Sequence, residues 1–174
     1  MEAKDVQKDA KELNSNNNNQ PIMSADKFTE IKTEILRRAR ENNACREQYG
    51  RAYNSNNLAE LMQVVKDNFN WACANHVITP DLIETYRTEF SDHEIYLNTD
   101  VEKGFLLCNT ARVKAWGNAT VEAYGNATVE AWGNAYCMSY ARIECKLSGN
   151  AIYREQCTNT IYYASDSLTF AKQS

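Results

Sequence analysis

The chain is poor in the residues that most often build catalytic and metal sites. It has two histidines in 174 residues, His76 and His93, and neither lies in residues 101–174. Its six cysteines form no Cys-x-x-Cys pair, although a zinc site needs ligands held close together. There is no glycine-rich phosphate loop, no nucleophile elbow and no metalloprotease helix motif. These absences predict a protein that is not an enzyme and that binds neither a metal nor a cofactor.

Charge and hydrophobicity argue against two further classes of protein. The net charge is −4, with 12 basic and 17 acidic side chains in residues 1–100 and 7 and 6 in residues 101–174. Neither half has the basic excess of a nucleic-acid-binding domain. No apolar run is long enough to span a bilayer, and the charged first five residues lack a signal-peptide core. We therefore expect a cytoplasmic protein with no membrane contact and with six reduced thiols.

A short repeat dominates the second half of the chain. Residues 115–135 read AWGNATVEAYGNATVEAWGNA, in which two full copies of an eight-residue unit are followed by the first five residues of a third. Because side chains of a strand alternate between two faces, an even period keeps the same facing in every copy. Repeats of this kind build solenoids, in which each coil stacks on its neighbour and is not stable alone. The sequence therefore predicts a β-solenoid over residues 93–174.

Aligning the octads separates interior from exterior columns. Three columns are apolar and mostly small, and we assign them to a narrow interior: Phe105, Val113, Val121, Val129, Cys137, Cys145, Tyr153 and Ile161; Leu107, Ala115, Ala123, Ala131, Ser139 and Leu147; and Ala111, Ala119, Ala127, Ala135, Ile143 and Ala151. Two mixed columns between them are expected to face water: Arg112, Thr120, Thr128, Tyr136 and Glu144; and Lys114, Glu122, Glu130, Met138 and Lys146. Gly-Asn pairs punctuate the units and predict the corners, because both residues tolerate positive φ.

The repeat allows two or three octads per coil. Three would place Gly117 on Ala141, whereas two octads stack like residues: Gly117, Gly133 and Gly149; Trp116 and Trp132; and Tyr124 and Tyr140. The Gly149-Asn150-Ala151 sequence restores the motif after a degenerate octad at 140–147. This favours a flattened coil of two octads.

The first half of the chain predicts a helical cap. Residues 1–22 contain a polar Asn-rich run and are expected to form a disordered lead-in. Residues 23–92 show helical periodicity that predicts about three helices. Ser24 is suited to cap the first, the second begins after Asn57, and Thr79-Pro80 supplies a cap and a first-turn proline for the third. The helices would cover the first coil, so the fold class is α+β, with a helical cap at 23–92 and a solenoid at 93–174.

An outward column of aromatic rings is the most suggestive candidate binding surface. It holds Trp116, Tyr124, Trp132 and Tyr140, which two octads per coil would divide into a Trp pair and a Tyr pair on opposite sides. Exposed rings can hold a sugar, a base or an apolar patch of a protein. The alternative is that the rings stack on themselves and stiffen the corners of the solenoid.

Two further groups of residues are candidates. Arg37, Arg38 and Arg40 form a basic cluster that can contact phosphate groups, although interleaved glutamates favour a salt-bridged helix face instead. Near the C-terminus, Tyr162, Tyr163 and Phe170 follow the last octads with no polar cap after them. They form a candidate edge for homo-oligomer assembly.

The octads resemble those of a group of uncharacterised proteins. The Ala-[Trp/Tyr]-Gly-Asn-Ala-Thr-Val-Glu units, the segment at 140–147 and the Asn-Thr-Ile-Tyr-Tyr segment at 159–163 are similar to short-repeat β-solenoid proteins of gut bacteria and their phages or mobile elements. The resemblance covers about residues 100–165. It implies no catalytic residues, and it implies a setting in which small cytoplasmic proteins often bind and block another protein.

These features predict a non-enzymatic interaction module that binds another protein, such as a counter-defence inhibitor or a regulatory protein. One alternative is a structural protein that self-assembles through its C-terminal coil. A further alternative is a nucleic-acid or nucleotide binder that uses the rings and Arg37, Arg38 and Arg40. A mass that grows with concentration would indicate assembly, and a steep loss of affinity with salt would indicate nucleic acid.

Overall fold

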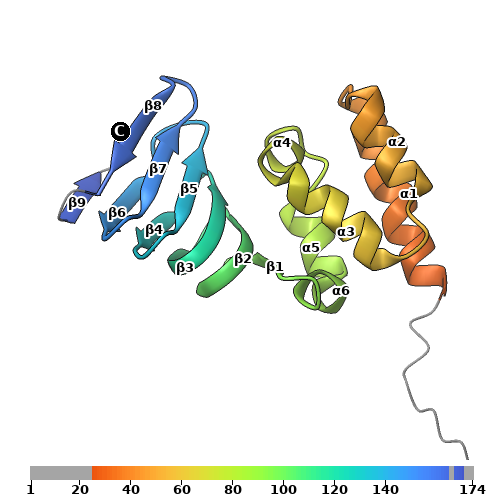
Figure 1. Ribbon diagram of the computed structural model, residues 1–174, viewed down its shortest axis with the longest axis horizontal. Helices are drawn as coiled ribbons and strands as arrows, with labels where there is room; N and C mark the ends of the chain where they lie inside the picture. The colour runs from red at the N-terminus through yellow and green to blue at the C-terminus, as the bar shows by residue number, and fades with distance from the viewer. Residues whose placement is uncertain (1–24, 165–166, 171–174) are drawn as a thin grey trace, which may run out of the picture.

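The computed structural model describes residues 25–164 and 167–170, in which six helices precede nine strands. The helices gather at one end of the molecule and the strands at the other (Figure 1), so the predicted α+β class is confirmed. The lead-in predicted at 1–22 and the cap predicted at Ser24 lie outside the described residues. The helices are α1 (Ala25–Glu41), α2 (Arg46–Asn54), α3 (Leu58–Asp67), α4 (Phe69–Ala74), α5 (Pro80–Thr85) and α6 (Arg87–Ser91). The strands are β1 (Ile95–Leu97), β2 (Val101–Cys108), β3 (Arg112–Ala123), β4 (Thr128–Ala131), β5 (Tyr136–Ser139), β6 (Glu144–Ser148), β7 (Ile152–Glu155), β8 (Thr160–Tyr163) and β9 (Ser167–Phe170).

Two helix starts follow from their capping residues. The side chain of Asn57 accepts a hydrogen bond from the backbone N–H of Glu60 at the start of α3, and the Glu60 carboxylate accepts one from the Asn57 amide. The first of these bonds satisfies a backbone N–H that the first turn leaves open, and the second holds the two side chains together. Thr79 caps α5 by accepting from the N–H of Leu82, and Pro80 occupies the first turn.

The structure divides the predicted three helices into six. At Asn68 the backbone (φ −124°, ψ 21°) leaves the helical range, so α3 ends and α4 begins there. The Asn68 amide donates to the carbonyl of Val64, which would otherwise lack a partner at the end of α3. The polar helix α2 buries only Ala52, and α6 is five residues long, so neither carries a strong hydrophobic periodicity.

Strands β3 to β7 form a parallel solenoid in which each coil spans two octads. On one side Val113 pairs with Val129 and Val129 with Cys145, which are steps of sixteen residues. On the other side Val121 pairs with Cys137 and Cys137 with Tyr153. The 12-residue strand β3 takes part in both sides, because its first half pairs with β4 and its second half with β5. The register predicted from the repeat is confirmed.

The three interior columns are buried as predicted between Val113 and Tyr153. Every member in this range is at most 2% exposed. The one polar member, Ser139, is satisfied because its hydroxyl donates to the carbonyl of Ala141 and lies 2.7 Å from the hydroxyl of Tyr153. Mostly small side chains from facing strands therefore fill the interior, and the larger Ile143, Leu147 and Tyr153 fill it toward the C-terminal end.

Stacked Gly-Asn pairs form one corner of the solenoid. The glycines of the repeat have φ between +59° and +67°, where side chains are disfavoured. A Cβ on Gly133 would lie 3.0 Å from the backbone nitrogen of Gly117. The neighbouring amides form a ladder, in which Asn134 donates to Asn118 and Asn150 donates to Asn134. The corner thus requires both the backbone conformation and the small size of glycine.

Both ends of the solenoid depart from the octad pattern. Strands β8 and β9 pair antiparallel with β7 and β6. Ile161, assigned to the interior, is 45% exposed, so that assignment was wrong. The reason is that reversal of the strand breaks the octad phase. At the other end, Phe105 turns toward the helices, and its ring centroid lies 5.1 Å from that of Phe69.

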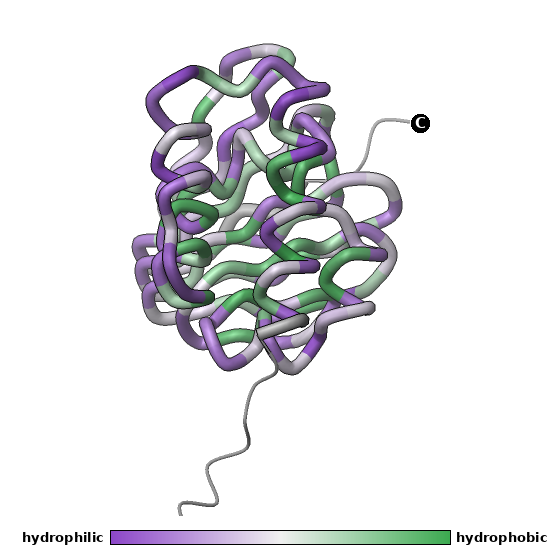
Figure 2. The backbone as a smooth tube through the Cα atoms, turned by 90° about the vertical axis from the view of Figure 1, so that its right-hand side faces the viewer, coloured by the Kyte–Doolittle hydropathy of each residue, from purple (hydrophilic) through white to green (hydrophobic). Residues whose placement is uncertain are grey.

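The helices cover one side of the solenoid as well as its first coil. Ile95, Leu97 and Leu107 belong to the same buried cluster as the apolar residues of the helices. Figure 2 views the molecule from the helical end, with hydrophobic segments running through its middle and hydrophilic turns around its outline. Glu122 and Met138, predicted to face water, are only 3% and 7% exposed. The prediction was wrong because helix α4 lies over this outer side of β3 and β5.

Candidate functional site

One side of the solenoid is not covered by helices, and we name it the open face. It consists of outward residues from the first half of β3, from β4 and from β6, which lie on the side away from α4 (Figure 1). These residues stand in three rows set by the two-octad coil: Arg112, Thr128 and Glu144; Lys114, Glu130 and Lys146; and Trp116 and Trp132. The repeat therefore produces a regular array of charges beside a pair of large rings.

The charges of the open face interact only weakly with one another. Arg112, whose side chain is 66% exposed, lies 3.9 Å from the carboxylate of Glu130 and 3.6 Å from that of Glu144. Ion pairs at this exposure contribute little to stability, about 0–1 kcal/mol. Lys114 and Lys146 are exposed as well. The fold depends little on these charged groups, which leaves them available to a partner.

The two tryptophans of the open face stack on each other. Their ring centroids lie 5.3 Å apart, and the ring planes differ by 6°. Trp132 is 36% exposed and Trp116 is half-buried. The stacking that was predicted as a structural role is thus present, and it leaves one large apolar surface exposed at the corner of the solenoid.

The two tyrosines of the ring column lie at the opposite corner. Tyr124 is 37% exposed, and burial raises the pKa of its hydroxyl, with further contributions from Cys73 and Asp81 of the helical part. Tyr140 is 68% exposed. The column therefore divides into two separate surfaces, and only the tryptophan pair belongs to the open face.

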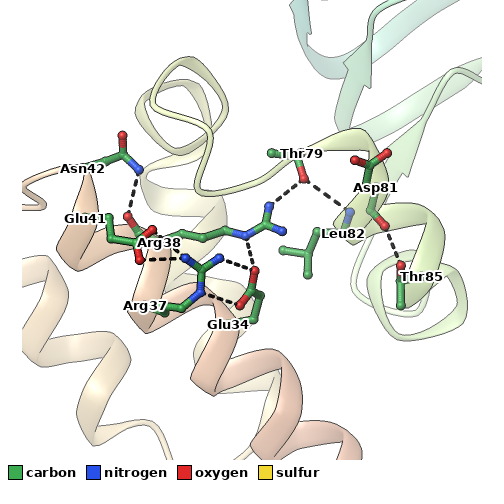
Figure 3. A network of polar contacts seen from close by, with 9 residues as sticks. All are labelled: Glu34, Arg37, Arg38, Glu41, Asn42, Thr79, Asp81, Leu82 and Thr85. Carbon is green, nitrogen blue, oxygen red and sulfur yellow. Dashed lines mark hydrogen bonds and ion pairs between the residues drawn. The ribbon is translucent and has the colours of Figure 1, made fainter.

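The candidate phosphate-binding arginines are engaged in contacts within the helical part. Arg37 donates to both Glu34 and Glu41, at 2.6–2.9 Å. Arg38 donates to Glu34 at 2.6 Å and to the Thr79 hydroxyl at 2.7 Å, which joins α1 to the cap of α5 (Figure 3). Both guanidinium groups thus have partners within the protein.

Arg40 and Glu34 also have partners within the helical part. The Arg40 guanidinium lies 5.5 Å from the ring centroid of Tyr49 and donates to its hydroxyl. Hydrogen bonds from Arg37 and Arg38 lower the pKa of Glu34 to about 2, so its carboxylate stays charged at neutral pH. This is the salt-bridged helix face that the interleaved glutamates favoured, and it leaves little unpaired positive charge for a phosphate.

The opposite side of the solenoid carries a buried acid. Glu122 lies beneath α4, close enough to Cys73 for its charge to act on that thiol. Its Oε2 atom has no hydrogen-bond partner. Burial raises the pKa of the carboxyl group to about 8, so the group is neutral at pH 7.

The buried thiols are poor nucleophiles. All six cysteines are free, and four of them are buried. Burial raises the pKa of Cys73 well above its usual value and that of Cys108 to about 11. Thiols that remain protonated at neutral pH are inert. We interpret these residues as apolar filling, as the sequence predicted for Cys137 and Cys145.

The candidate assembly edge is only partly exposed. The Tyr162 ring stacks on that of Tyr153 at 5.6 Å, and its hydroxyl accepts from Arg142. Tyr163 is 63% exposed. The backbone of Phe170 pairs with that of Cys145, and its side chain lies outside the described part of the chain. Of the three residues, Tyr163 is thus the one whose side chain is shown to be accessible.

Sequence reasoning missed the covered side of the solenoid, although one signal was present. Met138 occupies the octad position that holds Glu122 and Glu130 in the two preceding repeats. An apolar residue in a water-facing column indicates local cover. Arg154 pairs with Met138 on the neighbouring strand and lies in a cleft with Trp71. The octad pattern did not indicate it as a site residue.

Among residues 25–164 and 167–170, no three His, Cys, Asp or Glu side chains come together as a metal-binding group. In the same residues, no helix has the length and apolar character needed to cross a membrane. Comparisons with protein-family models, with curated proteins and with solved structures find no match.

Proposed function

We propose that the chain is a non-enzymatic interaction module that binds another protein through the open face of its solenoid. The observation that carries this proposal is the stacked Trp116–Trp132 pair, which is exposed beside rows of weakly paired charges. Tryptophan and arginine are the residues most enriched in binding hot spots. A flat face of regular rows suits a macromolecule better than a small ligand, which needs a concave site.

The rigidity of the coil supports the same proposal. The charged side chains of the open face stand on strands that pair in register, β3 with β4 and β4 with β6. The two rings are already stacked in the free protein. A partner therefore has little conformational entropy to remove on binding, which favours affinity.

The biological setting that we propose follows from the resemblance of the octads. It is that of a cytoplasmic protein from a phage or mobile element, acting as an inhibitor of a counter-defence type or as a regulatory protein. A non-enzymatic role is further supported by the state of the titratable groups, because the Cys73 and Cys108 thiols and the Glu122 carboxyl are held neutral by burial.

A double substitution tests the proposed surface. The tagged wild-type protein is used to capture a partner from a lysate of the source cells, in parallel with Trp116→Thr/Trp132→Thr. The double variant should keep its circular dichroism spectrum and lose capture by about tenfold or more, as expected for removal of a hot spot. Tyr163→Thr is the matched control, because it removes an exposed ring at the C-terminal end of the solenoid.

A second variant tests the same face even if the double tryptophan variant does not fold. Lys114→Glu/Lys146→Glu reverses the charge of two exposed side chains on the same face without touching the rings. It should weaken capture and change its dependence on salt. Capture that survives both double substitutions would contradict the proposal.

Self-assembly is a second candidate, favoured by one observation. Strand β8 ends the path of strands in the sheet, and its residues Ile161 and Tyr163 are 45% and 63% exposed. An exposed edge strand with apolar side chains can pair with a second copy. If this is the function, the mass in solution should rise with concentration, and Tyr163→Lys should abolish the rise. A nucleic-acid binder, the remaining alternative, would instead lose affinity steeply with salt.

A further inference from the structure

A cleft of about 370 Å³ lies between helix α4 and the outer side of β5 and β7. It is on the covered side of the solenoid, so it is separate from the open face. Two groups of residues line it. Asn70, Trp71, Ala74 and Asn75 come from α4 and the residue after it, and Met138, Arg154 and Gln156 come from β5, β7 and the residue after β7. Its volume falls within the range of sites for small molecules.

Two of the residues that line this cleft each hold a buried polar atom that has no hydrogen-bond partner among the described residues. These atoms are the Oδ1 atom of Asn70, which is an acceptor, and the Nε–H of Arg154, which is a charged donor. Another nitrogen of Arg154, Nη2, donates to Asn159 at 2.9 Å and fixes the guanidinium. Buried donors and acceptors are nearly always paired, because an unpaired one gives up its hydrogen bonds to water without replacing them. Asn70 and Arg154 therefore bring one unpaired acceptor and one unpaired charged donor to the wall of the cleft.

The charge of the cleft favours an anion. Of the seven described residues that line it, Arg154 is the only one with an ionisable side chain. The nearest residue along the strand, Glu155, points to the interior, where it pairs with Arg142 at 3.1 Å. Glu122 lies two steps away on the same ladder and is neutral at pH 7 because burial raises its pKa. Among the described residues that line the cleft, no acid thus opposes the single positive charge.

The apolar part of the cleft favours a flat ring. The Trp71 side chain is 39% exposed although it lies at the wall of the cleft, and Met138 lies on the opposing strand. Gln156 donates to the sulfur of Met138, which holds the thioether in place. Indole and thioether surfaces both pack well against aromatic rings.

We propose that this cleft binds a small aromatic carboxylate that carries one N–H or O–H donor. The carboxylate accepts from Arg154, the donor reaches Oδ1 of Asn70, and the ring packs against Trp71. A single guanidinium suits a monoanion, whereas a phosphate dianion generally recruits further basic groups. The proposal does not depend on the function of the open face.

Three related compounds test the two polar contacts. Indole-3-acetate has the carboxylate, the ring and the N–H donor; indole-3-acetamide lacks the charge; and 1-methylindole-3-acetate lacks the donor. Calorimetric titration of the full chain should show indole-3-acetate binding with a Kd of about 1 mM or below, the affinity expected for a ligand of this size. The amide and the N-methyl compound should each bind about tenfold more weakly.

Two variants locate the binding. Arg154→Gln should reduce affinity for indole-3-acetate about tenfold or more, and Ala74→Phe should abolish binding by filling the cleft from an exposed position of α4. Arg87→Gln is the control, because it removes an exposed arginine elsewhere. The proposal is overturned if indole-3-acetate does not bind, if acid and amide bind equally, if phenyl phosphate binds more tightly than the carboxylate, or if neither variant changes the affinity.

Discussion

The buried Glu122 gives the sharpest test of how the helices sit on the solenoid. Its octad position recurs at Glu130, which lies on the open face and is not covered. Replacing each glutamate with glutamine removes one ionisable group and keeps the shape of the side chain. The two variants therefore compare the same residue of the same repeat with and without α4 above it.

The effect of Glu122 on the free energy of unfolding follows from the pKa of its carboxyl group, which burial raises from its usual 4.5 to about 8. Below pH 4.5 the folded and unfolded chains both hold the proton, so the residue has no effect on stability. Between pH 4.5 and 8 the unfolded chain releases the proton while the folded chain keeps it, and stability falls as pH rises. At pH 7 the loss is about 3 kcal/mol, at about 1.4 kcal/mol for each pH unit.

Glu122→Gln should therefore stabilise the protein by about 3 kcal/mol at pH 7 and by less than about 1 kcal/mol at pH 5. The gain should level off above about pH 8. Urea denaturation at several pH values measures it, with the slope against urea unchanged. Glu130→Gln should alter stability by no more than about 0.5 kcal/mol at any pH. A gain for Glu122→Gln that does not grow with pH would refute the buried, neutral acid.

Two further substitutions test the solenoid itself. Val129→Asp places an unpaired charge in a position that is fully buried, so the repeat region should lose its β-type circular dichroism signal; a soluble, fully folded variant would contradict the inward facing. Gly133→Ala should destabilise by about 1–3 kcal/mol, because φ is +67° and the new Cβ would lie 3.0 Å from the nitrogen of Gly117. Gly50→Ala, in helix α2 with nothing within 4 Å of the added atom, should instead stabilise by about 0.5–1 kcal/mol in urea denaturation. Equal effects at the two glycines would count against the stacked corner.

The regular part of the fold was predictable because the pattern of the repeat determines the geometry of the coil. An even period, small residues in fixed columns and Gly-Asn at fixed intervals determine which side chains face inward, as Val113, Val121 and Val129 show. The stacking of Gly117 and Gly133 distinguished two octads per coil from three. Helix starts were predictable where a local cap exists, as at Asn57 and Thr79.

What the sequence could not provide depends on contacts between distant segments. The octad of Glu122 does not indicate that α4 will cover it, because it differs from the octad of Glu130 only at Trp116 and Tyr124. The reversal of β8 that exposes Ile161 likewise depends on pairing with β7. The cleft beside Arg154 exists only because two parts of the chain meet there. Tertiary context thus decided each of these positions.

Light scattering over a range of concentrations, alone and with the protein that the open face captures, tests the central claim most directly. The account predicts that the free protein keeps the mass of a single chain at every concentration. It also predicts that the wild type, but not Trp116→Thr/Trp132→Thr, forms one discrete heavier species with the captured protein. A free mass that rises with concentration, or a complex that forms equally with the double variant, would contradict it.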